Sequence, residues 1–256
     1  MTAYKHLKIK KTDGVARITL ARPKHNVLDI EMMTELNAEL DLLGVDPELK
    51  CAVILGEGPS WCAGVEVADH KPEMVSEMIA VFNGIFERID KIDVPVIAGV
   101  HGACLGGGME MAIACDVIVA AKSASFGQPE IKLGFFPPYA AIRLPQLIGA
   151  AKAVEVCTTG RRYSAEEAWQ MGFVSHAVDD DKLTGTLDQL IGEIRTSSPL
   201  IVRLNKRAVK KHLGLNFQEA LDGVSDLFLN ELMKTEDTLE GIRSFEEKRR
   251  PQWKNK

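Results

Sequence analysis

Short apolar runs alternate with helical patterns through the first half of this 256-residue chain. Residues 51–55, 94–100 and 117–121 are apolar at consecutive positions, which is typical of strands buried on both faces of a parallel sheet. An amphipathic pattern over about 72–89 and a short apolar pattern over 106–114 lie between these strands, and both are helical. Because parallel strands are joined by such crossovers, this order predicts an α/β fold.

A hairpin and a capped helix precede these strands. Residues 4–11 and 15–20 have strand patterns, and Asp13-Gly14 between them favours a tight hairpin turn. Asp29 then precedes a helical pattern and is a good N-cap residue. The chain is therefore expected to enter its parallel core through a β-hairpin and a helix.

Helical patterns fill the chain after about residue 140, and only 173–178 resembles a strand. No low-complexity linker and no internal repeat divides the sequence. We expect a core domain over 1–198 that carries the active site, followed by a helical region over 199–256. The apolar positions of this tail suit packing on the core and packing on a neighbouring subunit equally well: Leu221, Val224, Leu227, Phe228 and Leu232.

Composition excludes several classes of protein. A net charge of -5 and a pI near 5.8 argue against a general nucleic-acid binder. The first residues lack the apolar core of a signal peptide, and no apolar stretch reaches the ~18 residues that span a bilayer. We therefore expect a cytoplasmic protein that binds no membrane. The five cysteines lack CxxC or Cys/His spacing, so free thiols and no metal site are expected.

Two glycine-containing segments are candidates for binding a negatively charged oxygen. In Leu105-Gly106-Gly107-Gly108-Met109-Glu110 the glycines permit close approach to the backbone, and the first turn of a helix leaves N–H groups unpaired. The Val65 amide in Trp61-Cys62-Ala63-Gly64-Val65-Glu66, paired with the Gly107 amide, would complete an oxyanion hole with two donors. The alternatives are tight helix packing for the first segment and an ordinary turn for the second.

Two glutamates follow these segments in an apolar setting. Glu110 lies among apolar residues of a short helical pattern, and Glu130 follows Pro129. A carboxylate in such surroundings is costly to bury without a reason, and two of them suit proton transfer. The alternative for Glu110 is a pairing with an arginine or a helix N-terminus. The alternative for Glu130 is a solvated loop residue.

Other catalytic signatures are missing. The turn around Lys24 could meet a phosphate, although a solvated surface turn explains it as well. The sequence contains no GxGxxG after a strand, no Walker A motif and no GxSxG elbow, so hydride transfer, nucleotide hydrolysis and lipase-like serine chemistry lack their usual motifs.

Five ordered segments, which together run nearly end to end, resemble the crotonase superfamily of enoyl-CoA hydratases and isomerases. They read ARPKHNVLD, CAVILGEGPSWCAGVEV, PVIAGVHGACLGGGMEMAIACDVIVAAKSASFGQPEIKLG, TTGRRYSAEEAWQMGFVSHAV and EGIRSFEEKRRPQW. The resemblance implies a ClpP-like spiral of ββα units with a helical C-terminal trimerisation region, assembled as a homotrimer or a dimer of trimers. It also implies an acyl-CoA substrate, so coenzyme A is part of the substrate and no separate cofactor is expected.

The same resemblance assigns roles to residues of this chain. Val65 and Gly107 match the two amides that hold the thioester oxygen. Glu110 and Glu130 match the two catalytic glutamates of hydratases, with Glu130 in the main acid/base role and Glu110 orienting water. Residues that match the CoA-binding positions are Lys24, Val27, Ala63, Glu66, Val67, Ala68 and Lys248.

The segment after Glu130 departs from the usual hydratase pattern. Phe135, Phe136, Pro138 and Tyr139 stand where short-chain hydratases resemble a glycine-rich TIPGAGG, and these residues are expected to line the acyl pocket. Together with VEVADHKPEM, this segment is most similar to cyclohexa-1,5-diene-1-carbonyl-CoA hydratases of anaerobic benzoyl-CoA degradation. The alternatives are a short-chain enoyl-CoA hydratase, an isomerase that uses Glu130 alone, and a non-catalytic acyl-CoA-binding trimer.

Overall fold

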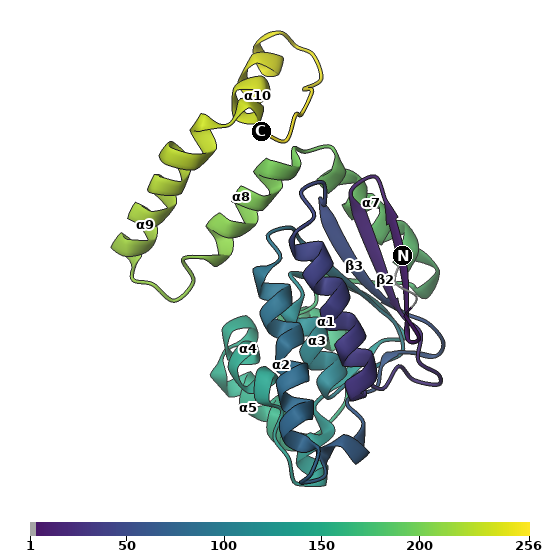
Figure 1. Cartoon of the computed structure of the whole chain (residues 1–256). Helices are drawn as coiled ribbons and strands as arrows, with labels where there is room; N and C mark the ends of the chain where they lie inside the picture. The colour runs from purple at the N-terminus through teal and green to yellow at the C-terminus, as the bar shows by residue number, and fades with distance from the viewer. Residues whose placement is uncertain (1–3) are drawn as a thin grey trace.

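A six-stranded sheet forms the centre of the computed structural model, which describes residues 4–256 (Figure 1). Its strands follow the order β1-β2-β3-β5-β7-β10. Only β1 and β2 pair antiparallel, as the predicted hairpin, and every other neighbouring pair is parallel. The strands are β1 Leu7–Thr12, β2 Val15–Leu20, β3 Cys51–Gly56, β5 Val96–Val100, β7 Val117–Ala121 and β10 His176–Val178.

A second, smaller sheet runs beside it in the order β4-β6-β8-β9. Strands β3, β5 and β7 of the large sheet are each followed in the chain by a strand of the small sheet and then by a helical segment, so successive ββα units wind into a spiral. The expectation that residue 140 is followed by a single strand is wrong, because β9 also forms there. It is a two-residue antiparallel partner of β8 and too short to show a period. The strands are β4 Ser60–Cys62, β6 Ala103–Leu105, β8 Ser125–Gly127 and β9 Tyr163–Ser164.

Helices cover both faces of the large sheet, which explains its consecutive apolar residues. One face packs into the main core with α1 Ile30–Gly44, α2 Val75–Lys91 and α3 Gly107–Ala114. The other face packs against Leu187 and Ile191 of α7 Leu183–Arg195. Asp29 caps α1 as predicted, since its carboxylate accepts a hydrogen bond from the Met32 amide at 2.9 Å.

The remaining helical segments surround one end of this core or extend from it. Helix α2 starts at Val75, three residues later than predicted, because residues 71–74 form a turn. Three short 3-10 segments, η1, η2 and η3, connect the spiral units. The segments are η1 Val67–His70, η2 Pro129–Leu133, α4 Pro138–Ile148, α5 Ala150–Thr159, α6 Ala165–Met171, η3 Asp180–Lys182, α8 Pro199–Lys210, α9 Phe217–Asp226, η4 Leu227–Glu231, η5 Leu232–Lys234 and α10 Glu236–Glu246.

The C-terminal tail, residues 199–256, projects from the core (Figure 1). Helix α8 is attached to the core by the Lys206–Asp116 ion pair (2.6 Å), but α9 lies beyond α8 on the side away from the sheet. The Phe217 side chain is 79% exposed, and Leu221 and Phe228 are also exposed. Packing of α9 on the chain's own core is therefore the wrong alternative, and packing on a neighbouring subunit stays a prediction.

Within residues 4–256, no helix combines the length and the apolar composition that crossing a bilayer requires. The division at residue 198 coincides with the Ser198 cap of α8, and a division into two domains stays a prediction.

Candidate active site

A cavity of about 350 Å³ opens where the spiral brings three segments together. The loop after β4, the N-terminus of α3 and the segment from Pro129 to Pro138 all contribute. The cavity contains most of the residues that the sequence singled out for chemistry. Those lining it are Ala63, Val65, Val67, Gly107, Glu110, Glu130, Phe135, Phe136 and Pro138.

Two backbone amides of this cavity are free of secondary-structure hydrogen bonds. Gly107 is the first residue of α3, so its N–H lacks an acceptor within the helix. The bridge between Leu28 and Val65 uses the Gly64 carbonyl and the Glu66 amide, and leaves the Val65 amide outside it. The two residues also touch, since a Cβ added to Gly107 would lie 2.5 Å from the Val65 Cγ2 atom. Glycine at 107 is therefore what leaves room for the Val65 side chain against the start of α3.

Glu110 is buried in the wall of the cavity and is held by backbone donors. Only 2% of its surface is exposed. Its Oε1 atom accepts hydrogen bonds from the Tyr139 amide (2.7 Å) and the Ala140 amide (2.9 Å). Both amides belong to the first turn of α4. The alternative interpretation of Glu110, a pairing with a helix N-terminus, is therefore correct for its Oε1 atom, while Oε2 is not held in this way within residues 4–256.

Glu130 reaches the same cavity from η2. Its Oε1 atom would lie 2.5 Å from a Cβ on Gly106, so the carboxylate rests against the backbone at the N-terminus of α3. Gly106 has a φ of 54°, a conformation that suits glycine. Glu130 is only partly exposed, and it is not the fully solvated loop residue that was the alternative.

Burial changes the ionisation of both glutamates. It raises the pKa of Glu110 to about 7, with a further increase from the charge of Glu130, while the amides of Ala140 and Tyr139 act in the opposite direction. Burial also raises the pKa of Glu130 to about 7. Two carboxyl groups that titrate near neutral pH can each gain or lose a proton during a reaction, which is what general acid and base catalysis requires.

Helix α2 supplies an apolar wall of the cavity that was not predicted to belong to the site. The wall consists of Val75, Met78, Ile79 and Phe82. Their spacing is the ordinary helical period, which indicates a buried face but does not distinguish a core from a cavity wall. The structure places Phe82 in the site by contact, since its ring would lie 2.9 Å from a Cβ added to Gly107, and no sequence signal announces that contact.

An aromatic pair lies at the edge of the cavity. The His70 ring at the end of η1 lies 5.1 Å from the Phe135 ring, between centroids, at a tilt of 41°. His70 donates from Nδ1 to the Glu66 carbonyl at 3.0 Å, because a carbonyl oxygen can only accept. Phe136 beside it is 72% exposed. His70 was not predicted to belong to the site, and its segment departs from the usual family pattern.

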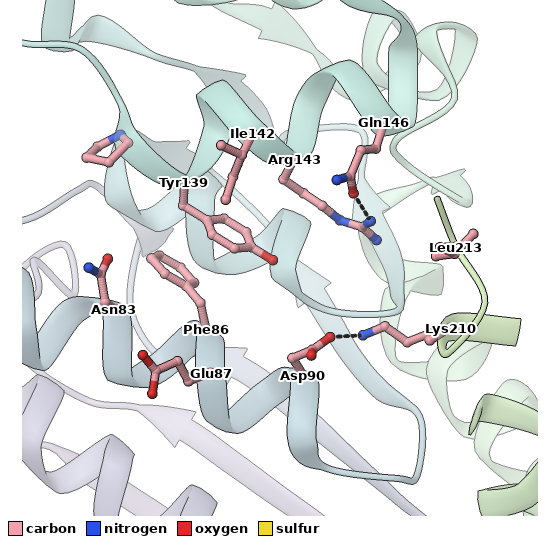
Figure 2. Close-up of a pocket in the computed structure, with 11 residues that line it drawn as sticks. Asn83, Phe86, Glu87, Asp90, Tyr139, Ile142, Arg143, Gln146, Lys210 and Leu213 are labelled. Atoms are coloured by element: carbon pink, nitrogen blue, oxygen red, sulfur yellow. Dashed lines mark hydrogen bonds and ion pairs between the residues drawn. The ribbon is translucent and has the colours of Figure 1, made fainter. Parts of the chain in front are cut away.

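The prediction that Tyr139 lines the acyl pocket disagrees with the structure. Its ring lies in a neighbouring cavity of about 590 Å³ and stacks on Phe86 of α2, with centroids 3.9 Å apart (Figure 2). Arg143 and Lys210 line this neighbouring cavity too. The two cavities share Pro138. Successive side chains of a helix point about 100° apart. The Tyr139 ring therefore turns away from Glu110, although the Tyr139 main-chain amide donates a hydrogen bond to the Glu110 carboxylate.

The residues matched to CoA-binding positions lie on two adjacent loops, except for Lys248, which lies in the C-terminal tail. The Ala63 amide donates to the His25 carbonyl (3.0 Å), which joins the loop after β4 to the turn that carries Lys24 and Val27. Arg22 strengthens this junction, since it donates to the Val27 carbonyl (2.9 Å) and lies 3.5 Å from Glu66. The joined loops are solvent-accessible beside the cavity, so a long ligand can extend from one to the other.

Of these CoA-binding candidates, Ala63 and Val67 line the cavity, whereas Glu66 and Ala68 do not. Lys248 follows α10 in the tail, at the opposite end of the molecule from α4 and α5 (Figure 1). A contact between Lys248 and CoA in this cavity therefore requires a second subunit, and it stays a prediction.

Among the described residues, one cluster has the spacing of metal ligands. Ligand atoms of His6, Asp29 and Glu31 lie within 4.8 Å of one another, and none of the three residues lines the cavity. Lys5 already pairs with Glu31 (2.6 Å), and Arg22 pairs with Asp29 (2.9 Å). These cations occupy the acids, so the cluster is explained as an ion-pair network.

Comparisons with known proteins agree with this geometry. The family model described as enoyl-CoA hydratase/isomerase matches residues 10–256. A cyclohexa-1,5-dienecarbonyl-CoA hydratase of Thauera aromatica is 32% identical over 250 residues, which cover 97% of this chain and 96% of the relative. A short-chain-enoyl-CoA hydratase of Clostridium acetobutylicum is also 32% identical, over 248 residues that cover 94% and 95%. Overall identity thus favours neither substrate.

A solved structure shares the whole fold. The crystal structure of an enoyl-CoA hydratase from Bacillus anthracis superposes with a TM-score of 0.94 at 30% identity, covering 98% of this chain and 100% of that one. The predicted α/β spiral is therefore confirmed, and an enzyme of the hydratase type is confirmed at the level of the family. The family model and the similar proteins agree with the cavity and its two carboxylates, and they show that the chain belongs to the enoyl-CoA hydratase/isomerase family.

Proposed function

We propose that this protein adds water to a conjugated enoyl-CoA thioester, and that its preferred acyl group is cyclohexa-1,5-diene-1-carbonyl. The product would be 6-hydroxycyclohex-1-ene-1-carbonyl-CoA, a step of anaerobic benzoyl-CoA degradation. The observation that carries the proposal is a single cavity that holds both Glu110 and Glu130 beside the amides of Val65 and Gly107. Coenzyme A enters as part of the substrate, and no cofactor takes part in the proposed reaction.

The two amides would stabilise the charge that forms during addition. Water attacks the carbon β to the thioester, and electrons move toward the thioester oxygen to give an enolate-like intermediate. Donors of an oxyanion hole are each worth about 3 kcal/mol in such a state. The Val65 and Gly107 amides are suited to this role because neither is used in a helix or strand ladder.

The glutamates would handle the protons. We assign Glu110 to the water, because its fixed Oε1 leaves its second oxygen to accept a hydrogen bond. Glu130 takes the main acid/base role and delivers a proton to carbon. With the cyclic diene, the oxygen of water bonds to C2 and a proton bonds to C5. The C1=C2 and C5=C6 double bonds are lost and a new double bond forms between C1 and C6, so the net change is the addition of one water molecule.

The shape of the cavity supports a compact, unsaturated acyl group. Phe82 from α2 and Phe135 and Phe136 from the segment after Glu130 supply aromatic walls, which favour contact with the face or edge of an unsaturated ring. The Pro138 ring occupies the position where a glycine would leave space. These bulky residues support a ring over a long straight chain.

The test is a comparison of substrates with purified protein. We expect a higher kcat/KM for cyclohexa-1,5-diene-1-carbonyl-CoA than for crotonyl-CoA, each followed by loss of the conjugated thioester. Faster turnover of crotonyl-CoA by several orders of magnitude would refute the cyclic assignment and favour a short-chain hydratase. Hydration of neither thioester would refute the hydratase.

Two alternatives to the hydratase can be tested by experiment. An isomerase would move a double bond with Glu130 alone and leave Glu110 without a catalytic task. A non-catalytic acyl-CoA-binding trimer would bind the thioester without exchanging protons at carbon. Incubation with the hydroxyacyl-CoA product in heavy water separates these cases, since only a catalyst incorporates deuterium at carbon.

We also propose that the chain acts as a homotrimer or a dimer of trimers. The exposed apolar side chains on the tail support this proposal, because a monomer would leave them in water. They are Leu213, Leu215, Phe217, Leu221, Phe228, Leu229, Leu239, Ile242 and Phe245.

A further inference from the structure

Gln128 is a fully buried polar residue next to the cavity, and no role has been assigned to it. It lies between the end of β8 at Gly127 and the start of η2 at Pro129, and none of its surface is exposed. A buried amide needs hydrogen-bond partners to offset the loss of water. With the amide nitrogen facing η2, Nε2 lies 3.0 Å from the Glu130 Oε2 atom and 3.3 Å from Oε1.

This orientation of the amide follows from its surroundings. In the opposite orientation the side-chain oxygen faces only acceptors and the nitrogen faces only donors, so neither atom is satisfied. Turning the amide gives its nitrogen the two oxygens of Glu130 as acceptors. The carboxylate is what fixes the amide.

We propose that Gln128 is a positioning residue for Glu130, which holds the carboxylate against Gly106 and favours its ionised form. The catalytic part of this inference rests on the proposed function, in which Glu130 has the main acid/base role.

Glu130 depends on this single side chain. Among residues 4–256, no other side chain donates a hydrogen bond to its carboxylate oxygens, and the main chain contributes only through the amide of Glu130 itself, which acts to lower its pKa. Glu110, in contrast, accepts from two amides of α4. The residue of α4 nearest in sequence to Glu130 is Pro138, which has no N–H to donate. The two catalytic glutamates are thus held by different means, Glu110 by a helix N-terminus and Glu130 by an amide side chain.

The other titratable groups around Glu130 do not replace this donor. Glu110 on α3 is an acid too, and the charge of Glu130 raises the pKa of Glu110, so it offers no stabilisation of ionised Glu130. Burial raises the pKa of the Cys157 thiol on α5 to about 11, so it stays neutral. His70 lies across the cavity in contact with Phe135, and Lys132 on η2 packs against Gly160. Within the described residues 4–256, the Gln128 amide is the only side chain that stabilises the charged form by direct contact, in addition to the main-chain amide of Glu130 itself.

The function of such an amide follows from the reaction. A carboxyl group that gives a proton to carbon in one direction removes it in the other, so its two forms must be of similar stability at working pH. Burial alone favours the protonated form, and the Gln128 amide acts in the opposite direction. Contact at Oε2 also leaves Oε1 as the oxygen beside Gly106, close to the Gly107 amide that would hold the substrate.

Three side chains of similar length at position 128 form the test. Gln128→Met removes the donor, and Gln128→Glu replaces it with a second carboxyl group. The dehydration of 3-hydroxybutyryl-CoA by each variant is followed against pH, because this direction requires ionised Glu130. We expect the acidic limb of kcat/KM to move to higher pH by about one to two units in Gln128→Met, the size of one hydrogen bond to a charge. A larger move is expected in Gln128→Glu.

A second readout needs no turnover. Loss of the donor should lower the free energy of unfolding relative to wild type increasingly as the pH rises through 7, where Glu130 ionises, and little at pH 5. A wild type that dehydrates neither 3-hydroxybutyryl-CoA nor 6-hydroxycyclohex-1-ene-1-carbonyl-CoA would refute the hydratase, and this measurement would still decide the role of Gln128. Our inference is overturned if both variants match wild type in pH dependence, or if they lose activity with no shift along the pH axis.

Discussion

Replacing Glu110 with glutamine should make the protein more stable at alkaline pH. The folded protein holds the proton of Glu110 more tightly than the unfolded chain does, because burial raises the pKa from 4.5 to about 7. Between these two values the folded state binds more protons than the unfolded state. The free energy of unfolding therefore falls as the pH rises through this window, and the full cost is present above pH 7.

The size of the effect follows from the shift. A pKa difference of this size corresponds to about 3 kcal/mol of lost stability at pH 8.5, and to about 1 kcal/mol at pH 5. Glutamine keeps the oxygen that accepts from the Tyr139 and Ala140 amides but does not ionise. We expect the free energy of unfolding of Glu110→Gln, relative to wild type, to be about 2–3 kcal/mol higher at pH 8.5 than at pH 5.

Urea unfolding at the two pH values, at equal protein concentration, measures this difference. Glu39→Gln is the matched control, since Glu39 is equally buried but pairs with Lys11 at 3.1 Å. It should gain no stability at alkaline pH, because the substitution removes an ion pair. A difference between Glu110→Gln and wild type that does not grow from pH 5 to pH 8.5 would refute the assignment of Glu110 as a buried acid with a raised pKa.

Three further changes test the rest of the site. Gly107→Ala should lower kcat by about 100-fold, because the new Cβ would lie 2.5 Å from Val65 Cγ2 and displace an oxyanion donor, whereas Gly185→Ala, where a Cβ meets nothing within 4 Å, should match wild type. Phe136→Ala should lower kcat/KM for the cyclic dienoyl-CoA by about 3–10-fold and that for crotonyl-CoA less, as steady-state kinetics would show; equal losses would contradict an acyl-group contact. Phe217→Asp should shift the mass measured by light scattering from a trimer toward a monomer, because a charge replaces an exposed apolar side chain of α9. A wild-type monomer would contradict the proposed assembly itself.

Much of the fold was predictable because the central strands of the large sheet, β3, β5 and β7, are covered on both faces. Apolar residues at consecutive positions, as in 117–121, identify such a strand without any partner information. The small sheet was not predictable in the same way. Its strands have two or three residues, and β9 is defined only by its pairing with β8. Pairing between distant segments leaves no period in the sequence.

The candidate site was predictable where chemistry and backbone geometry depend on residue type. A carboxylate in an apolar helix and a glycine run are visible in sequence, and the structure places Glu110 and Gly107 in one cavity. Side-chain direction was not visible. Tyr139 was assigned to the cavity of its neighbour Pro138, yet the helical turn directs its ring onto Phe86. Gln128 carried no signal, because its importance comes only from its contact with Glu130.

The central claim is that Glu110 and Glu130 together carry out the hydration. The most direct test compares wild type, Glu110→Gln and Glu130→Gln in the hydration of the better of the two acyl-CoA substrates. We predict that each substitution lowers kcat by at least about 100-fold while KM changes little, since each removes a group that transfers or orients a proton in the transition state. Retention by Glu110→Gln of more than about a tenth of the wild-type kcat would contradict a two-carboxylate hydratase.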